Sequence, residues 1–264
     1  MPEGDTIFRT ATTLRHALAG KPLVGFQTPR LRVRPPAPGT PVRSVEARGK
    51  HLLIAFGDGR VLHTHMRMSG SWHVYRPGER WWKSRAHARA ILETADAVAV
   101  CFSAPVVELL DEREVGTHPQ LSALGPDLCS PDADLDEAVR RMDLLPPETQ
   151  IGVALLDQRV ACGVGNVYKS ETLFAVRIDP FARIADLGAT TRRELLAKAS
   201  ELLRRNLDGR PRTTWEGGLA VYDRAGRPCP RCGTGIGSRR QGEDARTTFW
   251  CPSCQPSRSE EAAS

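Results

Sequence analysis

The first apolar positions of the chain recur with the period of a helix. Over residues 6–19 they lie three or four residues apart, and charged side chains fill the positions between them. The recurring residues are Ile7, Ala11, Leu14, Ala17 and Leu18. This spacing predicts an amphipathic helix that begins close to the N-terminus and packs one face against a core.

After Gly20 the apolar residues gather in short runs that glycine and proline separate. Five runs indicate β-strands: Leu23–Phe26, Leu52–Phe56, Val61–His65, Ala97–Phe102 and Val106–Leu109. Short strands with frequent turn residues are typical of a β-sandwich or barrel. The pattern therefore predicts a β-rich domain that reaches to about residue 122.

Helical periodicity returns in the second half of the chain. Ser130 or Asp132 can cap a first helix, and Glu148–Asp157 and Thr190–Leu207 give further helices. Between these helices, the glycine-rich turn of Gly163–Glu171 opens a helix whose N–H groups suit one phosphate. An ordinary helix–helix connection is the alternative. The turn is not a nucleotide-binding P-loop, because the lysine and hydroxyl do not follow the second glycine at the required spacing.

Charge and composition narrow the class of protein. Among 264 residues, 37 are Lys or Arg and 31 are Asp or Glu, which suits a polyanionic partner. Apolar runs are too short to cross a bilayer, and residues 1–20 mix charges instead of forming a signal-peptide core. We therefore expect a cytoplasmic protein without a membrane partner.

Four of the seven cysteines form two close pairs, Cys229-x-x-Cys232 and Cys251-x-x-Cys254, with 18 residues between them. In a reducing compartment this spacing predicts a four-thiolate zinc site. Four thiolates leave no open coordination position, so the zinc would be structural. The other three cysteines are interpreted as ordinary buried thiols: Cys101, Cys129 and Cys162.

The segment between the cysteine pairs predicts a small β-hairpin. Glycines follow the first pair, and the β-favouring run Thr247–Trp250 precedes the second. Arg239, Arg240 and Arg246 would lie on this hairpin, where cationic side chains suit phosphates.

The chain begins Met1-Pro2-Glu3-Gly4. Removal of Met1 would leave Pro2 as a secondary amine next to the carboxylate of Glu3. Model α-amino groups titrate near ~7.7–8.0, so part of such an amine is unprotonated and nucleophilic at neutral pH. Taken alone, these residues also suit an ordinary solvated terminus.

Together these segments resemble the formamidopyrimidine-DNA glycosylase/endonuclease VIII family. Five motifs follow the family's order over about residues 1–256: Pro2-Glu3-Gly4, Gly49–Leu53, His65–Gly70, Gly163–Glu171 and Val221–Gln255. The resemblance implies an α+β multidomain enzyme. Its expected parts are an N-terminal helix plus β-sandwich at 1–122, a helix–two-turn–helix domain at 126–213, a β-hairpin zinc finger at 221–255 and a disordered tail at 256–264.

The same resemblance implies a bifunctional DNA glycosylase and abasic-site lyase of base excision repair, which removes oxidised bases and cuts the strand by β,δ-elimination. Pro2 would attack C1′ of a flipped nucleotide and form a Schiff base, while Glu3 would transfer protons at the sugar. Lys50 would assist β-elimination, and Arg246 would grip the lesion phosphate and support δ-elimination.

Further contacts with DNA are implied by the resemblance. Asn166 would complete the phosphate clamp, His65 would add a contact, and Met68 would fill the stack that the flipped base leaves. The expected cofactor is one structural zinc ion. The expected partner is damaged DNA, bound by a monomer at the nucleoid.

Two departures from the family's purine-acting branch favour oxidised pyrimidines. Residues 109–116 lack the phenylalanine of an Arg–Phe wedge, and Gly209–Gly218 leaves little room for a lesion-covering loop. A third departure, Asp5-Thr6 where relatives commonly carry glutamate, leaves Asp5 without an assigned catalytic role.

Three alternatives stay open at the level of sequence. The first is a glycosylase directed at 8-oxoguanine or formamidopyrimidine. The second is a zinc-ribbon DNA-binding protein without catalysis, which leaves Pro2 and Glu3 unexplained. The third is a damage-binding member without turnover, against which the intact set of expected site residues argues.

Overall fold

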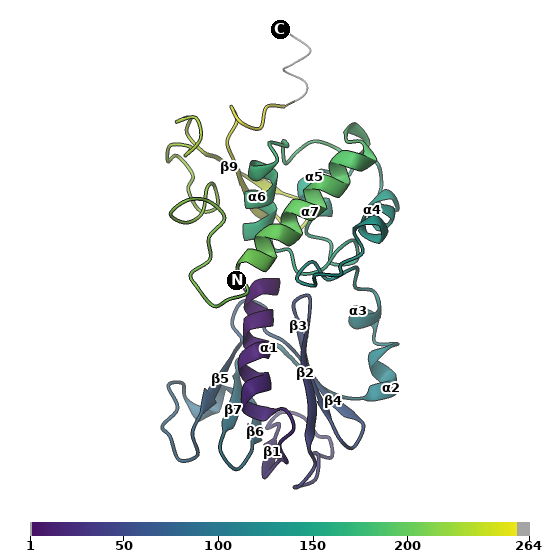
Figure 1. Cartoon of the computed structure of the whole chain (residues 1–264), viewed down its shortest axis with the longest axis vertical. Coiled ribbons are helices and arrows are strands. Elements are labelled where there is room, and N and C mark those ends of the chain that lie inside the picture. Colours follow the sequence, from purple (N-terminus) through teal and green to yellow (C-terminus); the bar gives the residue numbers. More distant parts are fainter. Residues whose placement is uncertain (1, 258–264) are drawn as a thin grey trace. The chain divides into compact units, whose positions relative to one another are not determined.

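The computed structural model describes residues 2–257 and divides the chain into two compact units, Met1–Ala123 and Leu124–Ser264 (Figure 1). Met1 and, from residue 258 on, the predicted tail lie outside the described residues. Within the described part, every helix is too short or too polar to span a membrane.

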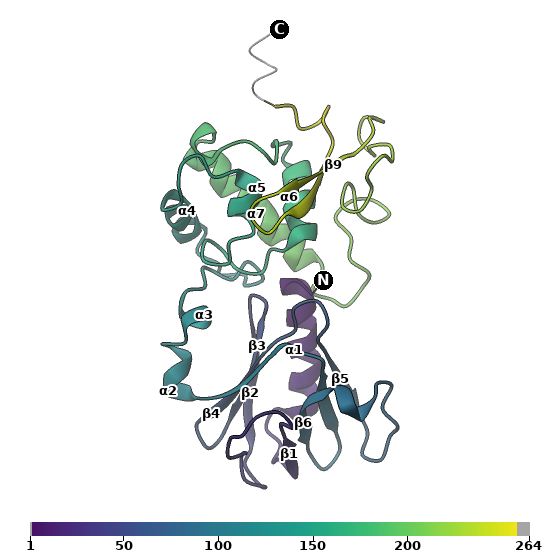
Figure 2. The ribbon, with the colours of Figure 1, turned by 180° about the vertical axis from the view of Figure 1, so that it is seen from behind.

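The first unit consists of one long helix and two four-stranded antiparallel sheets, with strand orders β1-β6-β7-β5 and β2-β3-β4-β8 (Figures 1 and 2). The long helix is α1 (Gly4–Leu18). The strands are β1 (Gly25–Gln27), β2 (Val42–Arg48), β3 (His51–Phe56), β4 (Arg60–His65), β5 (Ser71–Tyr75), β6 (Ala88–Glu93), β7 (Val98–Phe102) and β8 (Val106–Asp111). Short helical turns complete the unit: η1 (Arg85–His87), α2 (Glu112–Val115) and α3 (Pro119–Ser122).

The core of the first unit lies between the two sheets and α1. Leu52, Ile54 and Phe56 of β3 point into it, and α1 contributes its apolar stripe. The guanidinium of Arg15 also fixes α1 to β2, because it donates from Nε and Nη2 to the carbonyl of Val45 at 3.0 and 2.7 Å. The predicted N-terminal helix and β-sandwich are confirmed.

The second unit contains four α-helices, a 3-10 turn and a β-hairpin among its described residues. The helices are α4 (Leu135–Asp143), α5 (Ile151–Ala154), α6 (Asn166–Ala175) and α7 (Ala189–Arg205), with η2 (Ile184–Asp186) before α7. The expected cap of the first of these helices was wrong. Asp134 caps α4, because its carboxylate accepts the N–H of Glu137 at 2.8 Å.

The hairpin consists of β9 (Gly237–Gln241) and β10 (Arg246–Trp250), and it packs on α6 (Figure 2). Its apolar side meets a small core around Phe174 of α6, which includes Val221, Ile236 and Phe249. The hairpin is thus held by apolar contacts as well as by the cysteines at its base.

Candidate active site and nucleic-acid interface

The structure places Pro2 directly before α1, partly exposed, and buries the next residue completely. Glu3 begins the helix with an extended backbone, and its carbonyl accepts the N–H groups of Thr6 and Ile7 at 3.0 and 3.1 Å. A fully buried carboxylate is uncommon in proteins and needs compensating interactions. The start of α1 therefore holds an acid next to Pro2 in a protected position.

The Asp5 carboxylate contacts other residues of α1. Its carboxylate accepts the backbone N–H and the hydroxyl of Thr6 at 2.7 and 3.2 Å, and Arg9 lies 3.8 Å from it one turn later. These contacts explain why this buried acid is compatible with the fold, and they agree with leaving Asp5 without a catalytic assignment.

Lys50 lies in the two-residue turn between β2 and β3, where Arg48 and His51 form the last cross-strand pair. Gly49 takes the first turn position with φ +57°, a conformation that L-residues rarely adopt. The hairpin therefore presents the partly buried Lys50 at its tip.

His65 ends β4 opposite His51, and the two imidazole ring centres lie 4.6 Å apart. The N–H of Arg67 donates to His65 Nδ1 at 3.3 Å, so the proton of the neutral ring belongs on Nε2. Burial, followed by the charges of Arg67 and Lys50, lowers the pKa of His65 to about 4. At neutral pH His65 is thus an uncharged donor near Lys50.

Met68 lies in the loop after β4 and exposes 68% of its surface, whereas Met66 is buried. A large apolar side chain that projects into water is suited to insertion between bases. The exposed methionine of this loop is therefore Met68, the residue that the family resemblance predicts to fill the base stack.

In the second unit, Asn166 is the first residue of α6 and is nearly buried. Its Nδ2 donates to the carbonyl of Thr247 at 2.7 Å, which ties α6 to β10. Oδ1 is buried without a hydrogen-bond partner among the described residues. One Nδ2 proton therefore supports the hairpin, and the expected phosphate contact would use the other.

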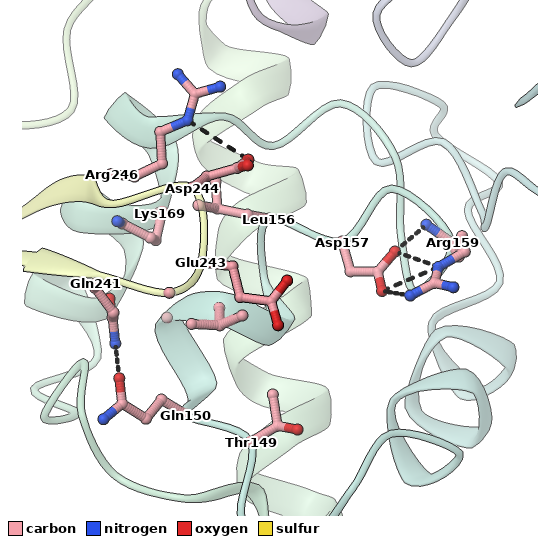
Figure 3. A pocket seen from close by; sticks show the side chains of 13 residues that line it. Thr149, Gln150, Leu156, Asp157, Arg159, Lys169, Gln241, Glu243, Asp244 and Arg246 are labelled. Atoms are coloured by element: carbon pink, nitrogen blue, oxygen red, sulfur yellow. Dashed lines mark hydrogen bonds and ion pairs between the residues drawn. The ribbon is translucent and has the colours of Figure 1, made fainter.

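Arg246, which begins β10, adjoins Thr247 and so lies beside the α6 N-terminus. Its side chain is 42% exposed, and Nε lies 3.9 Å from Asp244. It borders a hollow of about 550 Å³ that Lys169, Asp157 and Glu243 also line (Figure 3). A cation at an open rim can reach a phosphate.

Two buried charged residues of α6 were not singled out from the sequence. Lys169 donates from Nζ to Thr248 Oγ1 at 2.6 Å, beneath the hairpin. Glu171 accepts the N–H groups of Ala220, Val221 and Tyr222 at 2.7–2.8 Å, and the hydroxyl of Thr214. Both residues anchor the segments that carry Arg246 and the cysteines.

A side-chain network fixes the turn end of the hairpin as well. Gln241 Nε2 donates to Gln150 Oε1 at 2.8 Å (Figure 3). It also donates to the carbonyl of Pro180 at 2.8 Å, while Gln241 Oε1 accepts the hydroxyl of Thr248. The position of Arg246 is therefore set by buried polar contacts on both strands.

The four paired cysteines meet at the base of the hairpin, with all four sulfurs within 4.8 Å of one another. Cys229 and Cys254 sulfurs are 3.9 Å apart, and those of Cys232 and Cys251 are 3.5 Å apart. A tetrahedral ion with Zn–S bonds of about 2.3 Å requires sulfur separations of about 3.8 Å. The cluster thus fits one metal ion.

The expected site residues fall into two groups. Pro2, Glu3, Lys50, His65 and Met68 belong to the first unit, and Asn166, Arg246 and the cysteines belong to the second. The structure gives the position of each residue, and the expected roles stay predictions.

Two family profiles match the chain. The formamidopyrimidine-DNA glycosylase N-terminal domain matches residues 1–117, and the formamidopyrimidine-DNA glycosylase H2TH domain matches residues 124–215. Together they cover most of each unit but do not reach the cysteine-bearing hairpin.

Curated relatives match nearly the whole chain. A probable endonuclease 8 2 of Streptomyces coelicolor is 44% identical, over 97% of this chain and 94% of its own. The DNA-(apurinic or apyrimidinic site) lyase Nei2 of Mycolicibacterium smegmatis is 40% identical, over 97% and 99%. An endonuclease 8 of Escherichia coli is 34% identical, over 97% and 100%.

Solved structures share the fold. Lactococcus lactis formamidopyrimidine-DNA glycosylase, non-covalently bound to DNA with an abasic site, gives a TM-score of 0.83 at 22% identity, over 97% of this chain and 100% of that one. MutM in complex with DNA that contains carbocyclic 8-oxo-G gives 0.81, also at 22% identity and with the same coverage.

Proposed function

Because this chain belongs to the formamidopyrimidine-DNA glycosylase/endonuclease VIII family, we propose that it is a bifunctional DNA glycosylase and abasic-site lyase of base excision repair. The observation that carries the proposal is the start of α1, where Pro2 adjoins the fully buried Glu3. A solvated terminus has no need to bury an acid, whereas a nucleophilic amine needs a proton donor and acceptor beside it.

In the proposed reaction, the Pro2 amine adds to C1′ of the flipped nucleotide and the base leaves. The nitrogen lone pair then forms the C1′ iminium as the C1′–O4′ bond breaks and O4′ takes a proton from Glu3. The iminium accepts the electrons of the breaking C2′–H bond. Glu3 donates and accepts the protons of these steps, and Lys50, once its ammonium has given up a proton, receives the C2′ proton during β-elimination. The 3′-phosphate leaves as the strand is cut.

The second unit supplies the proposed phosphate grip. Arg246 provides a full positive charge, and Asn166 adds its remaining amide proton from the α6 N-terminus. Such contacts fix the register of the sugar without reading sequence. Arg246 also neutralises the leaving phosphate, which supports the second, δ-elimination.

Oxidised pyrimidines are the proposed substrates. The relatives named endonuclease 8 include the 44% identical protein of Streptomyces coelicolor. In addition, residues 109–116 end β8 and form α2, which Asp111 and Glu114 close as a polar capping box. No aromatic wedge can come from this stretch, because none of its residues is aromatic.

We assign the four-cysteine cluster to one zinc ion. The N–H groups of Arg231 and Cys254 donate to the sulfurs of Cys229 and Cys251, both at 3.4 Å, which favours thiolates. The ion would fold the hairpin base and take no part in the reaction. Monomeric binding to damaged DNA completes the proposal.

Strand cleavage of defined duplexes tests this function. We expect the protein without Met1 to cut an abasic-site duplex, and to process thymine glycol at least about tenfold faster than 8-oxoguanine. Denaturing gels with markers for each end would report the rates and the product of δ-elimination. Failure to cut the abasic site would exclude the lyase, and faster processing of 8-oxoguanine would assign the purine-directed alternative.

A further inference from the structure

One face of the β2-β3-β4-β8 sheet carries a cluster of ionisable side chains. On β3 and β4, Leu52 and Leu62 point into the core, so their neighbours His51 and His63 point to the opposite face. His63 is paired directly across from Glu108 of β8. The strand register therefore brings imidazoles and a carboxylate together outside the core.

These groups form a continuous chain of hydrogen bonds. His118, the cap of α3, and His63 Nδ1 both meet Glu108 Oε2, at 3.1 and 2.8 Å. The other nitrogen of His63, Nε2, lies 2.8 Å from Nδ1 of His51. The Glu108 side chain is 41% exposed, whereas His63 is fully buried. The chain thus leads from solvent into the protein.

The direction of each hydrogen bond follows from the carboxylate. An ionised carboxylate only accepts, so His63 donates from Nδ1 to Glu108. Neutral His63 then has its lone pair on Nε2, and His51 must donate to it from Nδ1. The neutral ring of His51 consequently keeps a lone pair on Nε2. Burial, and then the neighbouring histidines and Lys50, lowers the pKa of His51 to about 3, which keeps this ring neutral.

The inner end of the chain is His51, which directly follows Lys50 of the β2–β3 turn. The charge of Lys50 contributes to the lowered pKa values of both His51 and His65. The ionisable groups that shift the pKa values of His51, His63 and His65 come from the β2–β3 turn, β4, β8, α3 and the loop after β4. They are Lys50, His63, His65, Glu108, His118 and Arg67.

We propose that His51, His63 and Glu108 form a proton wire between Lys50 and solvent. A proton that Lys50 releases binds His51 Nε2, and the Nδ1 proton of His51 moves to His63 Nε2. The Nδ1 proton of His63 moves to Glu108, which gives it to water. One N–H or O–H bond breaks and one forms at each step, and no electrons are transferred. The inference rests on the proposed function, because Lys50 acquires its proton in β-elimination.

His118 positions the carboxylate instead of conducting the proton. The N–H of Leu121 donates to His118 Nδ1 at 3.4 Å, so the ring proton is on Nε2 and points to Glu108. His63, Glu108 and His118 are also close enough to hold a metal ion. That arrangement would need the His118 Nε2 lone pair, which the observed hydrogen bonds do not leave available.

The Glu108→Gln substitution of the full, zinc-loaded chain tests the wire. Glutamine keeps the shape of the side chain but cannot pass on a proton. We expect kcat for abasic-site cleavage to fall at least about tenfold with KM unchanged. The matched control is Glu112→Gln, an exposed acid on α2 that pairs with Arg43, and it should retain wild-type kcat. Unchanged kcat in Glu108→Gln, or a raised KM alone, would overturn the proposal.

Nitrogen-15 NMR of the wild-type histidines gives an independent readout that needs no variant. We expect the His63 proton on Nδ1 and the His51 lone pair on Nε2; the opposite tautomer at either ring would overturn the wire.

Metal analysis supplies a third outcome, since a second bound ion lost in Glu108→Gln would assign the cluster to a metal. A wild-type protein that cannot cut abasic DNA would instead refute the proposed function, which the tautomers do not test.

Discussion

A single glycine explains why Met68, and not Met66, faces solvent in the loop after β4. The N–H of Gly70 donates to the carbonyl of Met66 at 2.8 Å and closes the loop. A Cβ at Gly70 would lie 2.7 Å from Met66 Cα and from its carbonyl oxygen. Backbone atoms at that distance cannot yield without moving the loop, so Gly70 is part of what presents Met68.

The Gly70→Ala substitution should therefore destabilise the first unit by about 1–3 kcal/mol, as overpacking does elsewhere. Gly116→Ala is the matched control, because it has an ordinary φ of −70° and open space around its Cβ. Its free energy of unfolding should stay within about 0.5 kcal/mol of wild type. Urea unfolding compares the two, and equal stabilities would refute the role given to Gly70.

The sequence could predict the residues of local motifs, but not their distant partners. Pro2 and Glu3 follow from their place in the chain. Lys169 and Glu171, in contrast, find partners 79 and 43 residues away. No periodicity along the chain encodes such contacts, because the fold alone brings these groups together.

At the scale of elements, the hairpin β9–β10 depends on polar anchors and on the cysteine cluster. Its apolar core is small, and the turn end relies on Gln241, Thr248 and Lys169. Small domains with little core generally need a metal or disulfides to fold. The hairpin should therefore lose its structure when the cysteine cluster loses a ligand.

Substitution of Cys251 by Ser should remove about one zinc ion per chain and weaken binding to abasic DNA, since Arg246 loses its fixed position. Cys129→Ser, at a buried thiol outside the cluster, should keep the metal. Metal analysis and DNA titration of both proteins measure these effects. Unchanged DNA affinity after proven metal loss would remove the hairpin from the interface.

The strand β3 was predictable from its composition. All six of its residues are buried, and five of them, Leu52–Phe56, form a continuous apolar run. The strands β2, β5 and β6 were not predicted from the sequence; β2, for example, mixes the buried Val42 and Val45 with the exposed Arg43 and Glu46. The helix α5 was expected to be longer, but only Ile151–Ala154 is helical.

For the molecule as a whole, the buried histidines make stability depend on pH. The pKa of His51 falls from its ordinary 6.5 to about 3, and that of His65 to about 4, chiefly through burial. The unfolded chain therefore binds protons at a higher pH than the folded one. The two neutral rings make their full contribution to the free energy of unfolding above about pH 6.5. This contribution is lost progressively as the pH falls towards 3.

As the pH falls from 6.5 to 5, the lowered pKa of His51 alone should reduce the free energy of unfolding by on the order of 2 kcal/mol. Urea unfolding at several pH values, followed by a probe in the first unit, measures this slope. The slope should be smaller in His51→Gln and unchanged in His16→Gln, which alters an exposed histidine of α1. A slope that is the same in His51→Gln would contradict the assignment.

The central claim is that the amine of Pro2 forms the covalent intermediate, and borohydride trapping tests it most directly. The protein without Met1 should form an adduct with abasic DNA, and mass spectrometry of its peptides should place the DNA on residue 2. A form with an added N-terminal residue should bind an uncleavable abasic analogue but give no adduct, because its Pro2 nitrogen is an amide. An adduct on Lys50, or one undiminished by the extension, would contradict the account.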